Sequence, residues 1–309
     1  MEPRFLTVAE AARYLRLNPR SVYLLAQRGG IPASRVTGKW LFPAHLLDEW
    51  IESSARGRTG ASDAAAAARG SLPPGSLLLA GSDDPGLELL ADSLRDQPGQ
   101  PLLFSATLGR GGGLLALREG RADVAAYAHP APASGELDLG DLAQALPGRA
   151  LVVVNVFGRE LGLVVWTGNP RKLEGVGDLA RRGVRFVNRQ PGSATRAFTE
   201  AALAEARIER GAVVGYRDEV STHWAAGLRV LRGEADAGVA TRAVASALSL
   251  GFLPLAPERF DLVVPKDTFF RPPVQALIEA IRSERFRREV ERLGGYDWVR
   301  TGRVVGEVG

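Results

Sequence analysis

The chain of 309 residues contains no cysteine and only three histidines, and these absences narrow the kinds of site it can hold. Without cysteine there is no disulfide framework and no thiolate site for a metal or a redox reaction. His45, His129 and His223 lie far apart in the sequence, so the sequence predicts no zinc site. The apolar fraction of 45% and the charged fraction of 24% are ordinary for a soluble globular protein, which argues against wholesale disorder.

Long apolar runs are also missing. The most apolar stretch, residues 150–166, is interrupted by Asn155, Arg159 and Glu160, so no membrane span is predicted. Residues 1–15 have neither the apolar core nor the small-residue cleavage signal of a secretory peptide. We therefore expect a cytoplasmic protein with no membrane partner.

Positive charge is concentrated near the N-terminus. Residues 1–60 hold nine Lys and Arg against five Asp and Glu, a difference that equals the formal net charge of +4 of the whole chain. A small basic segment on a neutral body is typical of a protein that binds a polyanion through that segment.

A change of composition marks the predicted domain boundary. The segment between Ser53 and Ser76 lacks aromatic residues and apolar periodicity, and it closes on two prolines and a glycine. We expect a first domain over residues 1–54, a linker over residues 55–75 and a second domain over residues 76–309.

The first domain reads as a helix-turn-helix. Thr7 and Glu10 fit a capping box at the start of a helix over residues 8–15. Asn18 and Pro19 supply a cap and a first-turn proline for a second helix. Two short helices joined by a tight turn form this motif.

Residues 34–42 predict a wing, that is, two short strands joined by a turn at Gly38 and Lys39. A third helix is predicted to begin at Pro43. A recognition helix needs donors near its N-terminus for base edges and cationic or hydroxyl groups at its rim for phosphates. Residues of the second helix and the wing are suited to these roles, and the predicted DNA-binding residues are Arg20, Ser21, Tyr23, Leu24, Gln27, Arg28, Arg35 and Lys39.

The order of four short segments in this domain resembles the excisionase and MerR-type winged helix. They are FLTVAEAARYL from Phe5, RSVY from Arg20, GIPA from Gly30 and GKWLF from Gly38. The resemblance implies that double-stranded DNA is read by the second helix, with the wing on the backbone. A protein-interaction winged helix is the alternative role for this unit.

In the second domain, short apolar runs alternate with helical patterns, which argues for an α/β fold with largely parallel sheets. The predicted strands are residues 76–80, 102–106, 123–127, 151–157, 161–166, 184–187, 236–240 and 260–265. Two Ala-Asp motifs, at Asp123 and Asp236, each follow a helix end and a glycine and lead into a strand. This repeated pattern fits a domain with two similar lobes. Both aspartates are interpreted as structural acceptors of backbone N–H groups.

Four loops of the second domain follow a predicted strand and open a helix. Glycine lets an anion approach the backbone closely, and the exposed N–H groups and the helix dipole favour negative charge. Ser and Thr hydroxyls add neutral donors. The loop residues predicted to contact a small anionic ligand are Ser82, Asp83, Thr107, Arg110, Gly111, Gly112, Asn188, Arg189, Gly192, Ser193, Thr195, Arg196, Thr222 and His223.

The same loops resemble the periplasmic-binding-protein-like domain of cytoplasmic regulators, which is similar to type 2 solute-binding proteins for molybdate and tungstate. The segments that carry the resemblance are GRGGGL from Gly109, NRQPGSATR from Asn188, GYRDE from Gly215 and the Thr222-His223 pair. The resemblance implies a cleft between lobe 1 (about residues 76–158 and 262–309) and lobe 2 (about residues 159–261).

Arg110 departs from this family pattern, in which a serine is expected in the glycine loop. An arginine there either adds a contact to a larger or organic anion or points to solvent. Both readings stay open on the sequence alone.

These features predict a ligand-responsive DNA-binding transcription regulator that senses a small oxyanion, molybdate or tungstate first. We expect no catalytic residues, no cofactor and no metal site, and we expect a homodimer because one short recognition helix reads few base pairs. Two alternatives remain. One is an enzyme or binding protein for another small anion linked to molybdenum cofactor metabolism, and the other is a recombination-associated architectural DNA-binding protein.

Overall fold

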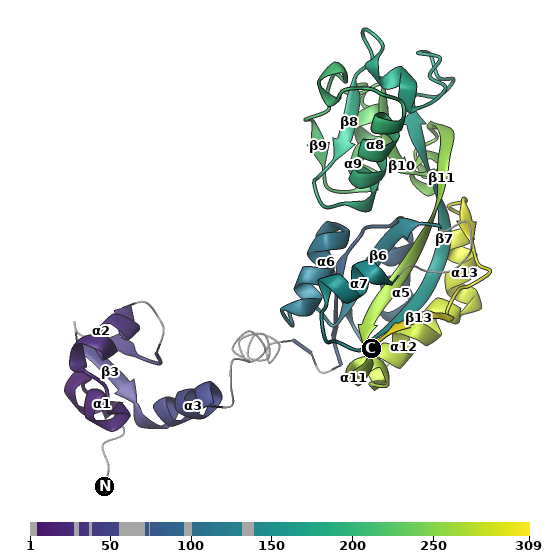
Figure 1. The fold of residues 1–309 in the computed structure, drawn as a ribbon. Helices are drawn as coiled ribbons and strands as arrows, with labels where there is room; N and C mark the ends of the chain where they lie inside the picture. The colour runs from purple at the N-terminus through teal and green to yellow at the C-terminus, as the bar shows by residue number, and fades with distance from the viewer. Residues whose placement is uncertain are drawn as a thin grey trace. The chain divides into compact units, whose positions relative to one another are not determined.

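The computed structural model describes residues 5–27, 31–36, 39–55, 72–73, 75–95, 101–131 and 139–309. The chain divides into two compact units, Met1–Ser71 and Leu72–Gly309 (Figure 1). The expected linker, residues 55–75, falls largely outside the described residues, so the predicted domain boundaries stay predictions.

The first unit combines a three-stranded antiparallel sheet with three helices. Its sheet has the order β1-β3-β2, and β2 pairs with β3 so that Ser34 lies opposite Leu41. The predicted wing is therefore confirmed, although its turn residue Gly38 lies outside the described residues. The elements are β1 (Phe5–Leu6), α1 (Val8–Leu15), α2 (Pro19–Gln27), β2 (Ser34–Val36), β3 (Lys39–Pro43) and α3 (Ala44–Ala55).

The helix starts of this unit are set by local hydrogen bonds, as the sequence predicts. The Thr7 N–H donates to Glu10 Oε2 at 2.8 Å, and the Glu10 N–H donates to Thr7 Oγ1 at 3.4 Å, which completes the capping box. Asn18 Oδ1 accepts from the Arg20 N–H at 2.8 Å at the start of α2. Buried Val22 and Phe42 belong to the core that joins the helices to the sheet.

The second unit is an α/β structure with two lobes, and this predicted fold is confirmed (Figure 1). Its strands are β4 (Leu77–Gly81), β5 (Leu103–Thr107), β6 (Val124–Pro130), β7 (Leu151–Val165), β8 (Phe186–Arg189), β9 (Glu219–Val220), β10 (Ala237–Thr241), β11 (Gly251–Pro265), β12 (Tyr296–Asp297) and β13 (Val304–Val308). Its α-helices are α5 (Pro85–Arg95), α6 (Gly109–Arg118), α7 (Gly140–Ala145), α8 (Ala194–Glu205), α9 (His223–Leu231), α10 (Arg242–Ala247), α11 (Lys266–Phe269), α12 (Pro272–Arg282) and α13 (Glu284–Glu291). Short 3₁₀ helices cover Val176–Ala180 and Arg210–Ala212.

Two long antiparallel strands connect the lobes. The strands follow the order β5-β4-β6-β11-β7-β10-β8-β9, and β7 and β11 pair with each other along most of their length (Figure 1). Within each lobe the remaining main strands are parallel, but β7 and β11 run antiparallel to their neighbours. The expectation of largely parallel sheets therefore holds only inside the lobes. The predicted separate strands over residues 151–157 and 161–166 are one strand, β7.

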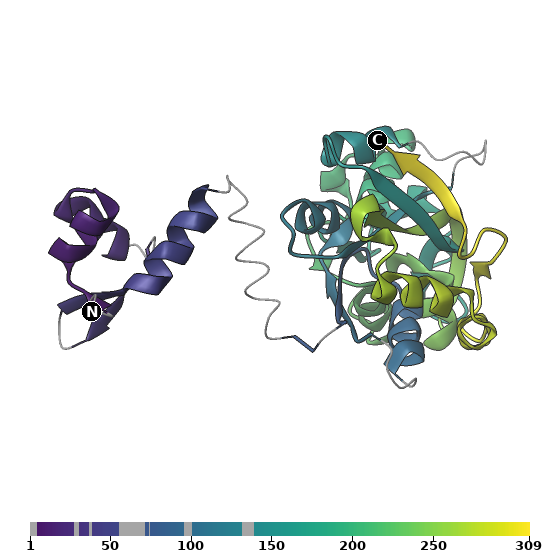
Figure 2. The same ribbon diagram turned by 90° about the horizontal axis from the view of Figure 1, so that it is seen from below.

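Each lobe has its own apolar core. In the first lobe, α5, α12 and α13 pack on one face of the sheet through residues such as Leu90, Phe157 and Phe286. On the other face, α6 and α7 pack through Leu117 and Leu142. The last strand, β13, lies along β7 and returns the C-terminus to this lobe (Figure 2).

The second lobe builds its core around β10, and Leu163, Phe186 and Val239 are among its buried residues. The two Ala-Asp motifs anchor neighbouring strands in the two lobes. Asp123 Oδ2 accepts the Leu78 N–H at 2.9 Å, and Asp236 Oδ2 accepts the Arg185 N–H at 2.9 Å. Their interpretation as structural acceptors is confirmed.

Candidate functional site

The exposed face of α2 carries most of the predicted DNA-binding residues. Val22 and Ala26 of this helix are buried, whereas Arg20, Ser21 and Gln27 are exposed. Tyr23 and Leu24 are also exposed, by 44% and 40%. A helix of nine residues that buries one stripe and presents polar and aromatic groups on the other has the form of a recognition helix.

The wing adds two exposed cations, Arg35 on β2 and Lys39 on β3. The Arg35 guanidinium lies 5.8 Å from the centre of the Trp40 ring, a contact that limits where this side chain can reach. Arg28 lies outside the described residues, so its predicted phosphate contact stays a prediction.

The four predicted anion loops all lie between a strand and a helix of the second unit. They follow β4, β5, β8 and β9 and open α5, α6, α8 and α9. Ser193 Oγ caps α8 by accepting the Arg196 N–H at 3.1 Å, and Thr222 Oγ1 caps α9 by accepting the Ala225 N–H at 3.0 Å. The loops after β4 and β5 belong to the first lobe, and the loops after β8 and β9 belong to the second.

Asp83 of the first lobe makes the central contact between the lobes. Its carboxylate accepts a hydrogen bond from Arg189 Nη2 and another from the His223 N–H, the latter at 2.6 Å. The His223 N–H is the first orphan donor of α9, so a carboxylate from the opposite lobe satisfies a helix N-terminus. Beside this contact, the Gly111 N–H donates to Gly192 O at 3.4 Å. We call this group of five residues the interlobe site.

The ionisation of the interlobe site follows from its burial. Burial raises the pKa of Asp83, but the His223 ring and the Arg189 guanidinium outweigh it and lower this pKa to about 2. Burial lowers the pKa of His223 well below its usual value, against the pull of Asp83. The His223 ring acts on this pKa only while it is protonated. At pH 7 the ring is neutral, and the Arg189 guanidinium together with the His223 N–H holds Asp83 ionised.

The interlobe site also contains polar atoms without partners. Within the described part of the chain, Arg189 Nη1 and His223 Nδ1 are buried and have no hydrogen-bond partner. Arg189 is otherwise well anchored, since its Nη2 also donates to Ser221 O at 2.9 Å. An unpartnered guanidinium nitrogen in the interior is costly unless a partner arrives, so this site has donor capacity to spare.

The sequence of the second unit matches the family described as "PBP superfamily domain" over residues 91–282, which is more than half of the chain. The chain belongs to the PBP superfamily. Residues 5–55 match the description "Helix-turn-helix domain", in agreement with the fold of the first unit.

Two curated relatives and two solved structures illustrate these similarities. "Uncharacterized protein YvgK" of Bacillus subtilis is 28% identical over 302 residues, which cover 97% of each chain. An "Uncharacterized protein in ferredoxin 2Fe-2S gene 5'region" of Clostridium pasteurianum is 34% identical over 102 residues, covering 33% of this chain and 90% of that protein.

The structural likeness lies in the PBP superfamily domain. A putative phosphate ABC transporter substrate-binding protein with bound phosphate from Clostridium perfringens aligns with a TM-score of 0.55 at 15% identity, covering 72% of this chain and 99% of that one. The sulfate-binding protein SubI from Mycobacterium tuberculosis aligns with a TM-score of 0.51 at 13% identity, covering 71% and 86%. At these identities the likeness establishes the two-lobed fold.

Several predicted ligand residues of the PBP superfamily domain are engaged elsewhere. Asn188 Nδ2 donates to Tyr216 O at 3.1 Å, and Ser82 Oγ accepts the Ala128 N–H at 3.2 Å. Arg196 binds Glu200 at 2.7 Å and Glu219 at 2.8 Å inside the second lobe. These contacts help to fix the shape of the loops, and the predicted role of these residues in ligand binding stays a prediction.

The remaining predicted ligand residues are not among the five residues of the interlobe site. Thr107 is exposed at the end of β5, and Thr195 is buried at the start of α8. Gly112 faces Leu108 of its own loop, since an added Cβ would lie 2.8 Å from Leu108 Cβ. The Arg110 guanidinium lies 5.5 Å from the centre of the Tyr127 ring, an arrangement that the sequence did not suggest.

Sequence reasoning missed Arg159, which lies directly behind Asp83. Its Nη1 donates to Asp83 O at 2.9 Å and to Asp84 Oδ2 at 2.7 Å, and its Nη2 lies 2.6 Å from Glu258 Oε2. Burial lowers the pKa of Arg159, but the charges of Glu258 and Asp84 outweigh this effect. The net pKa is raised above its ordinary value, so the guanidinium stays charged. The signal was present as charged residues within the otherwise apolar stretch of residues 150–166.

The described residues contain neither a metal-binding cluster nor a membrane-spanning helix. No group of three or more His, Asp or Glu side chains within them could hold a metal ion. No helix among them is long and apolar enough to cross a membrane.

Proposed function

We propose that this protein is a DNA-binding transcription regulator whose PBP superfamily domain binds a small oxyanion between its lobes. Molybdate and tungstate are the first candidates, on the family resemblance of the loop sequences. The proposal includes a homodimeric, cytoplasmic protein without catalytic activity. The observation that carries it is a pair of buried nitrogens without partners at the interlobe site, Arg189 Nη1 and His223 Nδ1. The second is a donor in the neutral tautomer that has its proton on Nδ1.

The arrangement of the interlobe site supports an anionic ligand. The first turn of α9 and the Arg189 guanidinium already hold one negatively charged group, the carboxylate of Asp83. An oxyanion that takes the place of this carboxylate meets the same donors, and the spare Arg189 nitrogen gives it one more. The two structural neighbours named above, a phosphate-bound and a sulfate-binding protein, favour the same class of ligand.

In this proposal, the helix-turn-helix unit converts ligand binding into a change in DNA binding. An anion that binds one arrangement of the lobes better than another shifts the population toward that arrangement. In a dimer, such a shift changes how the two recognition helices meet two half-sites on DNA. This is the reason to propose a regulator rather than a storage or transport protein.

A thermal-shift series on the full chain tests the ligand. Molybdate, tungstate, sulfate, phosphate and acetate are compared, and a ligand at about 100 times its Kd stabilises the folded protein by about 2.7 kcal/mol. Arg189→Gln should abolish this shift, whereas Arg232→Gln, an exposed arginine at the other end of α9, should retain it. If no oxyanion raises the midpoint of the wild type, the ligand proposal is wrong.

The DNA output is tested separately, on a duplex selected from a random library with the wild-type protein. Arg20→Ala should weaken binding by about 1–3 kcal/mol if its guanidinium contacts a base. The matched control is Arg13→Ala, which removes an exposed arginine from α1. Equal effects of the two substitutions would remove Arg20 from the recognition set.

A further inference from the structure

A cavity of about 420 Å³ lies at the hinge between the lobes, and it is lined by none of the residues predicted to bind a ligand. Four neighbouring strands meet around it. Arg259 of β11 lies opposite His129 of β6 and Gly158 of β7, and Gly158 lies opposite Asp297 of β12. Ala131, just after β6, also lines the cavity, which we call the hinge cavity.

Arg259 is a buried cation with free donors on the wall of this cavity. The residue is only 6% exposed, and its Nη2 donates to the carboxylate of Asp261 at 3.0 and 3.2 Å. Its Nε and Nη1 are buried and have no hydrogen-bond partner within the described residues. The Asp261 carboxylate also accepts hydrogen bonds from Asn155 Nδ2 at 2.6 Å and from His129 Nε2 at 2.7 Å.

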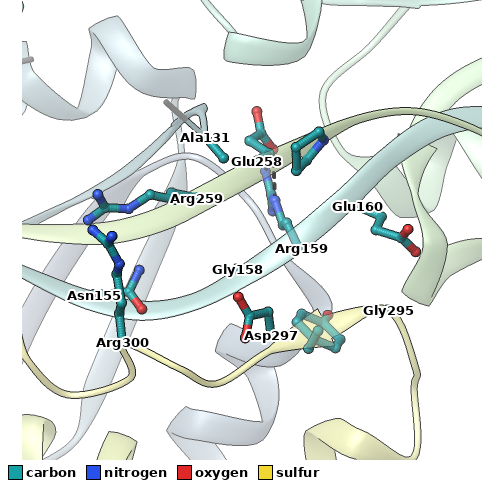
Figure 3. A pocket seen from close by; sticks show the side chains of 12 residues that line it. Ala131, Asn155, Gly158, Arg159, Glu160, Glu258, Arg259, Gly295, Asp297 and Arg300 are labelled. Atoms are coloured by element: carbon teal, nitrogen blue, oxygen red, sulfur yellow. Dashed lines mark hydrogen bonds and ion pairs between the residues drawn. The ribbon is translucent and has the colours of Figure 1, made fainter. Parts of the chain in front are cut away.

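The free donors of Arg259 need a partner from the cavity. A charged N–H group that is buried without an acceptor costs more free energy than a neutral one in the same position. The ion pair with Asp261 uses Nη2 alone and does not explain why Nε and Nη1 are buried. Figure 3 shows the side chain of Arg259 at the same end of the cavity as that of Arg300. Two guanidinium groups at one end of a partly open cavity are suited to a carboxylate or phosphate group.

The opposite end of the hinge cavity is acidic. Glu160 and Asp297 line it, and Figure 3 shows both carboxylates on the side away from the Arg259 and Arg300 guanidinium groups. Glu160 forms an ion pair with Arg242, and both side chains remain partly exposed. Carboxylates at this end accept hydrogen bonds, so they suit amino or hydroxyl groups.

We propose that the hinge cavity binds a small organic anion, with its acidic group against Arg259 and Arg300 and its amino or hydroxyl groups toward Glu160 and Asp297. A volume of about 420 Å³ lies in the range of pockets for organic ligands, about 300–1,000 Å³. A bare tetrahedral oxyanion leaves most of that space unfilled and nothing for the acidic end to bind. This proposal does not rest on the oxyanion proposed for the interlobe site.

Isothermal titration calorimetry on the full chain tests the site with four probes, D-glycerate, L-malate, L-aspartate and glycerol 3-phosphate. Sulfate is the control anion that has an acidic group but no donor. At least one probe should bind, and the phosphate and carboxylate arms show which acidic group the arginines prefer. Arg259→Gln should weaken that binding at least about tenfold, the loss expected for a charge-assisted hydrogen bond.

A second variant guards against a folding defect in Arg259→Gln. Ala131→Leu adds bulk to one wall of the cavity but leaves the Arg259–Asp261 pair intact, and it should weaken binding of the same probe. Arg189→Gln, at the interlobe site, should bind the probe as the wild type does, so failure of the oxyanion proposal is recognised separately. The proposal is overturned if no probe binds the wild type, or if binding survives Ala131→Leu unchanged.

Discussion

Replacing Asp83 by asparagine should tighten oxyanion binding while it destabilises the ligand-free protein. The Asp83 carboxylate occupies donors that an oxyanion would use, Arg189 Nη2 and the His223 N–H. A ligand must therefore displace this carboxylate or lie beside it. Asparagine keeps the size of the side chain and removes its negative charge.

The magnitudes follow from these contacts. Two unit negative charges 4 Å apart repel by about 4 kcal/mol at an effective dielectric constant of 20, and moving the carboxylate away relieves part of this. A gain in oxyanion affinity of at least about tenfold is therefore expected for Asp83→Asn. In the absence of ligand, the lost charge-assisted hydrogen bonds should lower the unfolding free energy by about 2 kcal/mol. For a domain of this size that corresponds to a fall of about 5 °C in Tm.

Titration calorimetry with molybdate and with sulfate, together with thermal unfolding of the ligand-free protein, measures both effects. Asp92→Asn is the matched control, because Asp92 is an exposed aspartate of α5 whose partner among the described residues is exposed Arg95. If Asp83→Asn binds every oxyanion more weakly than the wild type, Asp83 contributes to ligand binding. The competition argument is then wrong.

Three further predictions concern pH, glycine and capping. The pKa of Asp83 is about 2 in the folded protein against 3.8 as its ordinary value, so its stabilising contribution of about 2 kcal/mol is complete above pH 4 and is lost as the pH falls toward 2. Wild-type and Asp83→Asn unfolding curves should converge over that range. Gly109→Ala should hold the lobes apart, because φ of Gly109 is +72° and the new Cβ would lie 2.8 Å from Gly192 O of the opposite lobe. X-ray scattering should show this as an increased radius of gyration. Gly111→Ala, with nothing within 4 Å, is its control. Thr7→Ala should lower the stability of the helix-turn-helix unit by about 1 kcal/mol in chemical denaturation, unless the capping box contributes nothing.

The helix-turn-helix unit was the part of the fold most open to sequence reasoning, because its signals are local. The Thr7–Glu10 box and the Asn18 cap act over two or three residues, and both are present where they were predicted. The wing follows from two short strand patterns on either side of the turn at Gly38 and Lys39. Such short-range chemistry needs no knowledge of the rest of the chain.

The hinge strands show where local reasoning fails. Gly158, Arg159 and Glu160 interrupt the apolar pattern, so β7 was divided into two strands. In the folded chain the charge of Arg159 is neutralised by Asp84 and Glu258, which lie 75 and 99 residues away in the sequence. Only the tertiary contacts make a continuous strand possible there.

The candidate sites also differ in how far local sequence reveals them. Loops between strands and helices can be recognised from their glycines and hydroxyl residues, and Asp83, Arg189 and His223 were singled out on that basis. Their assignment to ligand binding stays a prediction. Arg259 could not be found, because its free donors matter only when distant strands come together beside a cavity.

Arg159 gives the two sites a physical connection. It lines the hinge cavity, and through its Nη1 it also holds the backbone carbonyl of Asp83 and the carboxylate of Asp84. Its partner Glu258 lies on the other long strand, so the charged group spans both strands that cross between the lobes. A buried charge cannot give up one partner without gaining another, since the unpaired state costs several kcal/mol. The hinge cavity and the backbone of Asp83 therefore share one buried charged group, and a change in the spacing of the hinge strands acts on both.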